Sequence, residues 1–273
     1  FGALPNVTII QPCNGEETKW ATEYCVNDAE ENCVIRLVIG PSPEKIKLPK
    51  DYKFKIGVGA ELTEGNNAIL FSYGPVMLHE ALVAADYLKK IGFGLKVINM
   101  PWLNKIDNEW LKRIVQDQKK IFVLEDHSAI GGLGDRLLNT LTEIGEIIGP
   151  TSSGKDRTSP GQAKEFINFG LKEYPECGTP LEVLEFHKLD GKSLAQRISG
   201  KADIGSTSGG ETEEKVKQKY TKEDFVLGAF DLFSRYGIKS VTMEDISREM
   251  AISKKTIYTM VADKSELVDN VIN

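Results

Sequence analysis

Three short stretches of the sequence combine residue types that can bind phosphate or move protons. Residues 149–156, GPTSSGKD, nearly match the phosphate-binding loop G-x-x-x-x-G-K-[ST]. Their last position is Asp156, where that loop needs a hydroxyl to ligate magnesium, and a carboxylate there would repel a phosphate. The segment RTSPGQA that follows is a poor start for a helix. We therefore interpret residues 149–156 as a surface loop.

A glycine-rich turn and an acid–histidine pair form the other two stretches. Residues 131–135, GGLGD, follow an expected strand and open an expected helix, so their amides could cradle an anion. They lack the full G-x-G-x-x-G spacing, which favours a tight strand-to-helix turn that needs glycine. Asp126 and His127 stand at the carboxyl end of that strand, where α/β sheets place ligands. Because adjacent strand residues point to opposite faces, a structural hydrogen-bonding role is favoured over acid–base work.

Residues 252–267, ISKKTIYTMVADKSEL, combine basic, hydroxyl and aromatic side chains in a pattern typical of a DNA-reading helix. An expected helix over residues 254–261 would span ~12 Å, which suits a major groove ~12 Å wide. The side chains expected to face DNA are Lys254, Lys255, Thr256, Tyr258 and Thr259, and those expected in the core are Ile257, Met260 and Val261. Thr242 and Lys264, at the starts of the neighbouring helices, are expected to meet backbone phosphates.

Composition excludes several other classes of function. The 273 residues suffice for one large domain or two small ones, and the net charge of −6 argues against broad adhesion to nucleic acid or to an anionic membrane. The four cysteines form no C-x-x-C pair and the three histidines are far apart, so we expect reduced thiols and no metal site. No apolar run reaches the ~18 residues of a membrane span and no secretory signal is recognisable, so we expect a cytoplasmic protein without a membrane partner.

Strands and helices are expected to alternate over the first two thirds of the chain. The expected strands are residues 7–12, 33–40, 67–74, 94–101 and 121–127. The expected helices are residues 14–28, 75–92, 108–120, 135–145, 179–187 and 191–198. Residues 149–180 are otherwise expected to be irregular. This alternation on short links predicts an α/β three-layer sandwich with a mostly parallel sheet.

The pattern changes to helices alone after a polar linker at residues 201–219. Three capping boxes are recognisable: Thr221–Asp224, Thr242–Asp245 and Asp263–Glu266. Two apolar stripes are also recognisable: Phe225, Ala229, Phe230 and Phe233, then Met243, Ile246 and Met250. Only the link AIS separates the second expected helix from the third, which predicts a small all-α helix-turn-helix domain over residues 220–273.

Several stretches of the first part resemble, in the family's order, the C-terminal part of transketolase-like, thiamine-diphosphate-dependent enzymes. They are FGALPNVTIIQPCNGEET, ILFSYGPVMLHEALVAADYL, VLEDHSAIGGLGDRLL and PECGTPLEVLEFHKLDGKSLAQRI. The resemblance implies that residues 1–55 are the tail of the pyrimidine-binding domain and residues 56–200 the C-terminal domain. It also implies that the complete enzyme transfers a two-carbon ketol unit between phosphosugars.

The same resemblance implies that residues 1–200 lack the parts of these enzymes that bind and activate the cofactor. In that family, thiamine diphosphate and Mg²⁺ are held by an amino-terminal domain, and the activating glutamate precedes the matching stretch. The resemblance therefore implies that this fragment alone binds no cofactor and contains no catalytic residue. Whether the chain is an enzyme at all stays open at this point.

Two weak substrate contacts carry over from the family. Arg36, in VIRLV, matches an arginine that binds the sugar phosphate, and a guanidinium suits a phosphate bidentately. Asn14 stands where the family has an aspartate near the sugar, and Gln11 stands where it has an arginine. The alternative role for Asn14 is to cap its own helix.

The last part, FVLGAFDLFSRYGIKSVTMEDISREMAISKKTIYTMVADKSELVDNVI, resembles the amino-terminal DNA-binding domain of TetR-type repressors. The resemblance implies that residues 254–261 are the recognition helix and that double-stranded DNA is the partner. It also implies a truncation, because such repressors continue into a helical domain that binds a small ligand and forms the dimer. A single half-site reader is expected to bind DNA weakly and in a salt-sensitive way.

We expect that the chain joins pieces of two genes, an enzyme fragment and a DNA-binding module. The alternatives are a genuine TetR-type regulator with an enzyme-derived amino-terminal domain, a bifunctional protein and an engineered fusion. A further alternative is the C-terminal subunit of a split transketolase, which would pair with a separate amino-terminal subunit or form a homodimer.

Overall fold

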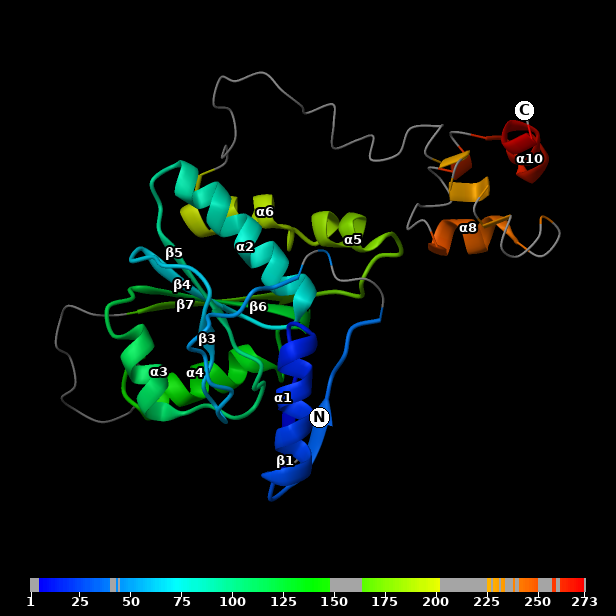
Figure 1. Cartoon of the computed structure of the whole chain (residues 1–273). Coiled ribbons are helices and arrows are strands. Elements are labelled where there is room, and N and C mark those ends of the chain that lie inside the picture. The colour runs from blue at the N-terminus through cyan, green and yellow to red at the C-terminus, as the bar shows by residue number, and fades with distance from the viewer. Residues whose placement is uncertain are drawn as a thin grey trace. The chain divides into compact units, whose positions relative to one another are not determined.

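The computed structural model divides the chain into two compact units (Figure 1). One consists of Phe1–Pro175 with Leu184–Gly205, and the other of Glu176–Val183 with Ser206–Asn273. The structure describes residues 5–39, 43, 45–147, 164–201, 225–226, 228–230, 232–233, 238, 241–249, 257–258 and 261–272. Both β-sheets belong to the first unit, and we call the second one the helical unit.

A five-stranded sheet forms the middle layer of the first unit. Its strands are β3 (Ala60–Glu61), β4 (Ala68–Ser72), β5 (Leu95–Asn99), β6 (Lys120–Ser128) and β7 (Glu165–Leu171). Their order across the sheet is β3-β5-β4-β6-β7, and every pair is parallel except β3 with β5. Every residue of β4 is buried, as expected of a central parallel strand that is covered on both faces. The mostly parallel sheet is therefore confirmed.

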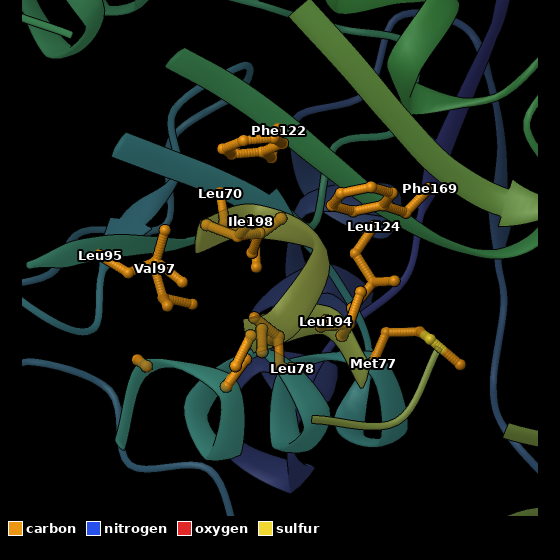
Figure 2. Packing of buried hydrophobic residues seen from close by; sticks show 14 of the residues in the cluster. Leu70, Met77, Leu78, Leu95, Val97, Phe122, Leu124, Phe169, Leu194 and Ile198 are labelled. Atoms are coloured by element: carbon orange, nitrogen blue, oxygen red, sulfur yellow. The ribbon is translucent and has the colours of Figure 1, made fainter. Parts of the chain in front are cut away.

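Helices cover both faces of this sheet (Figure 1). The helices on one face are α2 (Pro75–Lys90) and α6 (Gly191–Ser199), and those on the other are α3 (Asn108–Val115) and α4 (Leu133–Glu143). Figure 2 shows the first face, where the sheet residues Leu70, Val97 and Phe122 pack with Leu78 and Ile198. The alternate strand residues form the second core with α3 and α4. The three-layer sandwich is thus confirmed.

A second, two-stranded sheet precedes these layers. In it β1 (Val7–Ile10) pairs in parallel with β2 (Asn32–Ile35), and α1 (Gly15–Asn27) connects the two strands. Ile9 and Ile10 belong to the core cluster of α3 and α4. The backbone nitrogen of Leu103 donates to the carbonyl of Ile9 at 2.9 Å, so β1 is tied to the segment that follows β5.

Two strands were not expected, and several element boundaries differ from the expectation, among them that of the strand expected at residues 33–40, which is Asn32–Ile35. The segment Glu165–Leu171 was expected to be irregular, but it forms the edge strand β7, where Phe169 stacks on Phe122 of β6 at 5.5 Å between ring centroids. Most of its residues are only partly buried, as is usual for a strand at the edge of a sheet, so the sequence signal for it was weak. The short β3 was also not expected. Helix α3 ends at Val115 rather than at residue 120, and α4 begins at Leu133 rather than at residue 135.

The helical unit has its own small core. Its described helices include α8 (Met243–Glu249) and α10 (Lys264–Ile272), and α5 (Pro180–Phe186) crosses the boundary between the units. The buried core residues are Phe225, Ala229, Leu232, Phe233, Val241, Ile246, Ile257, Val261 and Leu267. Phe230 was expected in this stripe, but its side chain is 53% exposed, because residues 225, 229 and 232 share one helix face and residue 230 does not.

Of the three expected capping boxes, the Thr242–Asp245 box is formed in the helical unit. Asp245 accepts from the nitrogen of Thr242 at 2.9 Å, and the Thr242 hydroxyl accepts from the nitrogen of Asp245 at 3.1 Å. In the expected Asp263–Glu266 box, Asp263 accepts from the nitrogen of Glu266 at 2.9 Å, and Glu266 accepts from the nitrogen of Ala262, one residue before the cap, at 2.6 Å. The Thr221–Asp224 box, the linker and the GPTSSGKD segment lie outside the described residues. Among the helices that the structure describes, none is both long enough and apolar enough to span a membrane.

Candidate functional site

Polar side chains gather where strands β4 and β6 end. Tyr73 directly follows β4, and its hydroxyl lies 3.1 Å from Oδ1 of Asp126, 3.4 Å from Oε2 of Glu125 and 3.4 Å from Nε2 of His127. The three partners are consecutive residues near the carboxyl end of β6. Burial, with added repulsion from Asp126 and Glu125, raises the pKa of Tyr73. Tyr73 is therefore a neutral hydrogen-bonding group that the two acids share.

Asp126 connects this group to the two-stranded sheet. Its carboxylate accepts from Nε2 of Gln11 at 2.9 Å and from Nη2 of Arg36 at 3.2 and 3.3 Å. The Arg36 side chain is 32% exposed, and that of Asp126 is 20% exposed. Among the described residues, Nη2 is the one guanidinium nitrogen of Arg36 with a hydrogen bond. Asp126 thus holds the side chain of Arg36 and leaves its other two nitrogens available.

Glu125 occupies the amino-terminal end of α4. Its side chain is fully buried, and it accepts from the backbone nitrogens of Leu133 and Gly134, both at 3.0 Å, and from Nδ2 of Asn168 at 2.8 Å. A carboxylate satisfies the free amides of a helix start and complements its dipole. A Cβ on Gly132 would lie 1.7 Å from Oε2 of Glu125. The anion cradle considered for GGLGD is therefore filled by the protein's own carboxylate.

This geometry explains the glycines and identifies a residue that sequence reasoning missed. A Cβ on Gly134 would lie 2.0 Å from Nδ2 of Asn168, and Gly131 has a φ of +77°. The prediction of a tight strand-to-helix turn that needs glycine is therefore confirmed. The signal for Glu125 was an acid near the end of a buried strand, directly before a glycine-rich helix start.

A cavity of about 480 Å³ lies beside the Asp126 group. It is lined by residues from β1, from β6 and the turn after it, from the ends of β2 and β5, and from α4. These are Ile9, Arg36, Leu103, Asn104, His127, Ile130, Gly131, Gly132, Asp135, Arg136 and Asn139. Its volume lies in the range of roughly 300–1,000 Å³ that is typical of small-molecule sites. Arg36, which was predicted from sequence as a site residue, and Arg136, which was not, therefore line the same cavity.

A second buried acid ties α1 to the sheet. Glu17 is fully buried and accepts from the backbone nitrogen of Cys13 and from Nδ2 of Asn99, both at 2.8 Å. The Tyr52 hydroxyl lies 3.4 Å away and completes the group. Burial raises the pKa of Glu17, although its hydrogen bonds oppose this. None of these four residues lines the cavity, and we assign the group to the stability of the fold.

In the helical unit, two adjacent residues of the expected recognition helix have opposite environments. Ile257 is fully buried in the core, whereas the Tyr258 side chain is 52% exposed. Thr242 is exposed, and its hydroxyl donates to Asp245 at 2.6 Å. Nζ of Lys264 lies 6.0 Å from the ring centroid of Phe233. The other residues expected to face DNA lie outside the described residues; they are Lys254, Lys255, Thr256 and Thr259.

Two family models match parts of the chain. Residues 57–189 match the family model of the transketolase C-terminal domain, and residues 226–271 match that of bacterial regulatory proteins of the tetR family. The chain therefore joins a transketolase C-terminal domain to a tetR-family domain. The recognition helix expected from sequence falls within the second match.

Known relatives of the transketolase part include separate C-terminal sections and subunits. The putative transketolase C-terminal section of Methanocaldococcus jannaschii is 26% identical over 208 residues, 72% of this chain and 56% of the relative. A subunit of the apulose-4-phosphate transketolase of Phocaeicola vulgatus is 25% identical over 183 residues, 67% of this chain and 58% of the relative. The chain thus spans little more than half the length of these relatives.

A solved structure supports the same assignment. The structure described as a split gene transketolase, inactive beta4 tetramer, aligns with a TM-score of 0.59 and 25% identity over 74% of this chain and 60% of that one. The transketolase of Campylobacter jejuni is 20% identical with a TM-score of 0.52, which concerns the fold alone.

The two substrate contacts expected for the transketolase part lie in different places. Arg36 lines the cavity, as a phosphate-binding residue requires, and its role stays a prediction. Asn14 does not line it: its Oδ1 accepts from the nitrogen of Glu17 at 2.8 Å and its Nδ2 donates to the carbonyl of Ile46 at 2.8 Å. The alternative role of Asn14 as the cap of α1 is confirmed. Gln11 donates to Asp126 and so supports Arg36 indirectly.

Proposed function

We propose that the transketolase part acts as one component of a two-component transketolase, in which a separate chain supplies the cofactor-binding domain. The observation that carries this proposal is the likeness, over 74% of the chain, to a structure described as a split gene transketolase. The relative from Phocaeicola vulgatus, itself one subunit of a transketolase, supports it. The complete enzyme would transfer a two-carbon ketol unit between phosphosugars.

The described residues do not fit thiamine diphosphate and its Mg²⁺ by themselves. A hard cation bound to a diphosphate needs oxygen ligands from carboxylates or carbonyls. Within the described part of the chain, no three His, Cys, Asp or Glu side chains are grouped to hold a metal ion. The acids at the cavity already accept hydrogen bonds: Glu125 from α4, Asp126 from Gln11 and Arg36, and Asp135 from the nitrogen of Gly131. The proposal therefore assigns the cofactor to the partner component.

In this proposal Arg36 contacts the phosphate of the sugar. Asp126 accepts from one nitrogen of the guanidinium, and Arg36 lines the cavity. A guanidinium with two nitrogens left over can still donate to a phosphate in a fork geometry. Tyr73 and Gln11 hold Asp126 in turn, so the arginine is oriented before the substrate arrives.

The test combines the full chain with an amino-terminal transketolase component from a relative that carries its two parts on separate chains. We expect ketol transfer only when both chains and thiamine diphosphate are present, and a loss of activity for Arg36→Gln with little change in the urea midpoint. If the two chains do not associate in sedimentation, or associate without any activity, the proposal is wrong.

We further propose that the tetR-family domain binds double-stranded DNA through the helix that carries Tyr258. The specific observation is the match at residues 226–271 together with the environment of two neighbours, Ile257 in the core and Tyr258 in solvent. A duplex-shift assay on a randomised DNA library should select a sequence that the chain binds in a salt-dependent way. Equal binding of all sequences would contradict a specific role.

A further inference from the structure

The segment between β2 and β3 concentrates positive charge. Residues 45–55, KIKLPKDYKFK, contain five lysines and one acid, Asp51, and so have a net charge of +4. The whole chain has a net charge of −6, which leaves −10 for all its other residues together. A positive segment on an otherwise acidic chain attracts anions to one place on the molecule.

The residues between these lysines anchor the segment in the two cores of the first unit. Ile46 is 2% exposed and packs in the core of α2 and α6, and Phe54 packs against the core of α3 and α4. The Tyr52 hydroxyl lies 3.4 Å from Oε1 of the buried Glu17. This anchoring leaves the lysines in solvent, and all five are exposed: Lys45, Lys47, Lys50, Lys53 and Lys55.

Four of the five lysines have no counter-charge in the part of the chain that the structure describes. Lys55 forms an ion pair with Asp107 at 3.6 Å. Among the described residues no acid lies within ion-pair distance of the other four, which we call the lysine strip: Lys45, Lys47, Lys50 and Lys53. Their ammonium groups repel one another, and an anionic partner that extends along the segment would relieve this repulsion.

We propose that the lysine strip binds the phosphate backbone of double-stranded DNA without reading its sequence. Lysine ammonium groups are point charges on flexible stems, which suit successive phosphates of a backbone. Residues 45–55 contain no Arg, Asn or Gln, the side chains that most often read base edges in a bidentate way. The rings of Tyr52 and Phe54 pack on Trp20 and Trp102, so they are not available to stack on unpaired bases, and a duplex is favoured over a single strand.

The choice of DNA as the anion rests on the function proposed for the tetR-family domain. One chain carries both that domain and the lysine strip, so DNA bound by the domain is available to the strip at a raised effective concentration. A few weak phosphate contacts then add to the affinity. A strip that binds membranes needs apolar side chains between its lysines to insert into the lipid, and Ile46 and Phe54 pack in the cores instead.

The experiment measures the affinity of the full chain for a short duplex of random sequence by fluorescence anisotropy, between about 50 and 200 mM salt. The strip variant replaces all four lysines of the strip with glutamine. The matched control makes the same change of net charge with glutamine at four exposed lysines elsewhere in the first unit: Lys89, Lys112, Lys172 and Lys192. Equal urea midpoints of the three proteins establish that the substitutions leave the fold intact.

Each phosphate contact contributes about 0.9 to the slope of log affinity against log salt concentration. The slope of the strip variant should therefore be less steep by about 3–4, and its affinity at the lowest salt should fall by about tenfold or more. The control variant should keep the slope of the unaltered chain.

Three results would overturn the inference: an unchanged slope in the strip variant, an equal loss in the control, and no binding of the duplex by the unaltered chain. Lysine-dependent binding to vesicles that contain phosphatidylserine, without binding to the duplex, would assign the strip to a membrane instead. Tyr258→Ala separates the two proposals. If it abolishes sequence selection while the strip variant binds normally, the inference alone fails. If binding of the random duplex needs the strip while no sequence is selected, the inference stands and the specific role of the tetR-family domain fails.

Discussion

Substitution of Gly132 by alanine tests whether the Glu125 carboxylate holds the start of α4. The backbone of Gly132 has φ −102° and ψ −159°, which an alanine adopts without strain. The added Cβ, however, would lie 1.7 Å from Oε2 of Glu125 and 2.7 Å from Cε1 of His127. The carboxylate must therefore leave its place, and it loses its hydrogen bonds to the nitrogens of Leu133 and Gly134. At about 1.5–3 kcal/mol for each of these two bonds to a charged group, we expect a loss of roughly 3–6 kcal/mol.

Gly131→Ala is the matched control at the neighbouring position. Its φ of +77° strains an alanine by about 1–2 kcal/mol, but its Cβ would meet no atom within 4 Å. The assay is urea unfolding followed by tryptophan fluorescence, because Trp20, Trp102 and Trp110 all lie in the first unit and report on it alone. The expected order of destabilisation is Gly132→Ala above Gly131→Ala.

A double-mutant cycle with Glu125→Ala completes this test. Glu125→Ala vacates the space that the new Cβ would enter, so Gly132→Ala should cost less than about 1 kcal/mol in that background. A cost for Gly132→Ala within about 1 kcal/mol of that for Gly131→Ala, or additive costs in the cycle, would refute the role assigned to Glu125.

Three further predictions concern pH and the helical unit. Burial holds the pKa of Glu17 above its ordinary value of 4.5, so its contribution to stability is present below pH 4.5 and is lost as the pH rises through the raised pKa. The difference in urea midpoint between the unaltered chain and Glu17→Gln should therefore change with pH. A constant difference would contradict this. The hydrogen bond from the nitrogen of Trp110, with Lys55 nearby, holds the pKa of Asp107 below 3.8, so its contribution to stability is present above pH 3.8 and is lost as the pH falls through the lowered pKa. Asp107→Asn should therefore flatten the fall of stability at acid pH. Asp107→Ala should also cost about 1 kcal/mol of helix capping, and equilibrium unfolding measures both effects. Ile257→Ala should destabilise the helical unit by about 2–4 kcal/mol in circular dichroism melts. Tyr258→Ala should leave its melting nearly unchanged and weaken DNA binding. The reverse pattern would show that Tyr258 rather than Ile257 lies in the core.

The sequence determined the elements whose periodicity is strong. The all-apolar run of β4 and the helical spacing of α2 were sufficient to predict a covered parallel strand and its helix, because each pattern matches one geometry. The Thr242–Asp245 box was predictable for the same reason, since capping depends on neighbours within one turn. The cap role of Asn14 was also weighed from sequence, because the cap and the backbone nitrogen that donates to it are three residues apart.

Only the tertiary structure decided the arrangement of the candidate site. Arg36 and Asp126 are 90 residues apart in sequence, and no local rule relates them. Strand β7 is identified by its pairing with β6, and the glycines of the α4 turn are explained only once Glu125 and Asn168 are in place. Arg136 looks like an ordinary helical arginine until the cavity is seen. The physical reason is that local propensity acts over a few residues, whereas burial, ion pairing and close contact depend on segments that folding brings together.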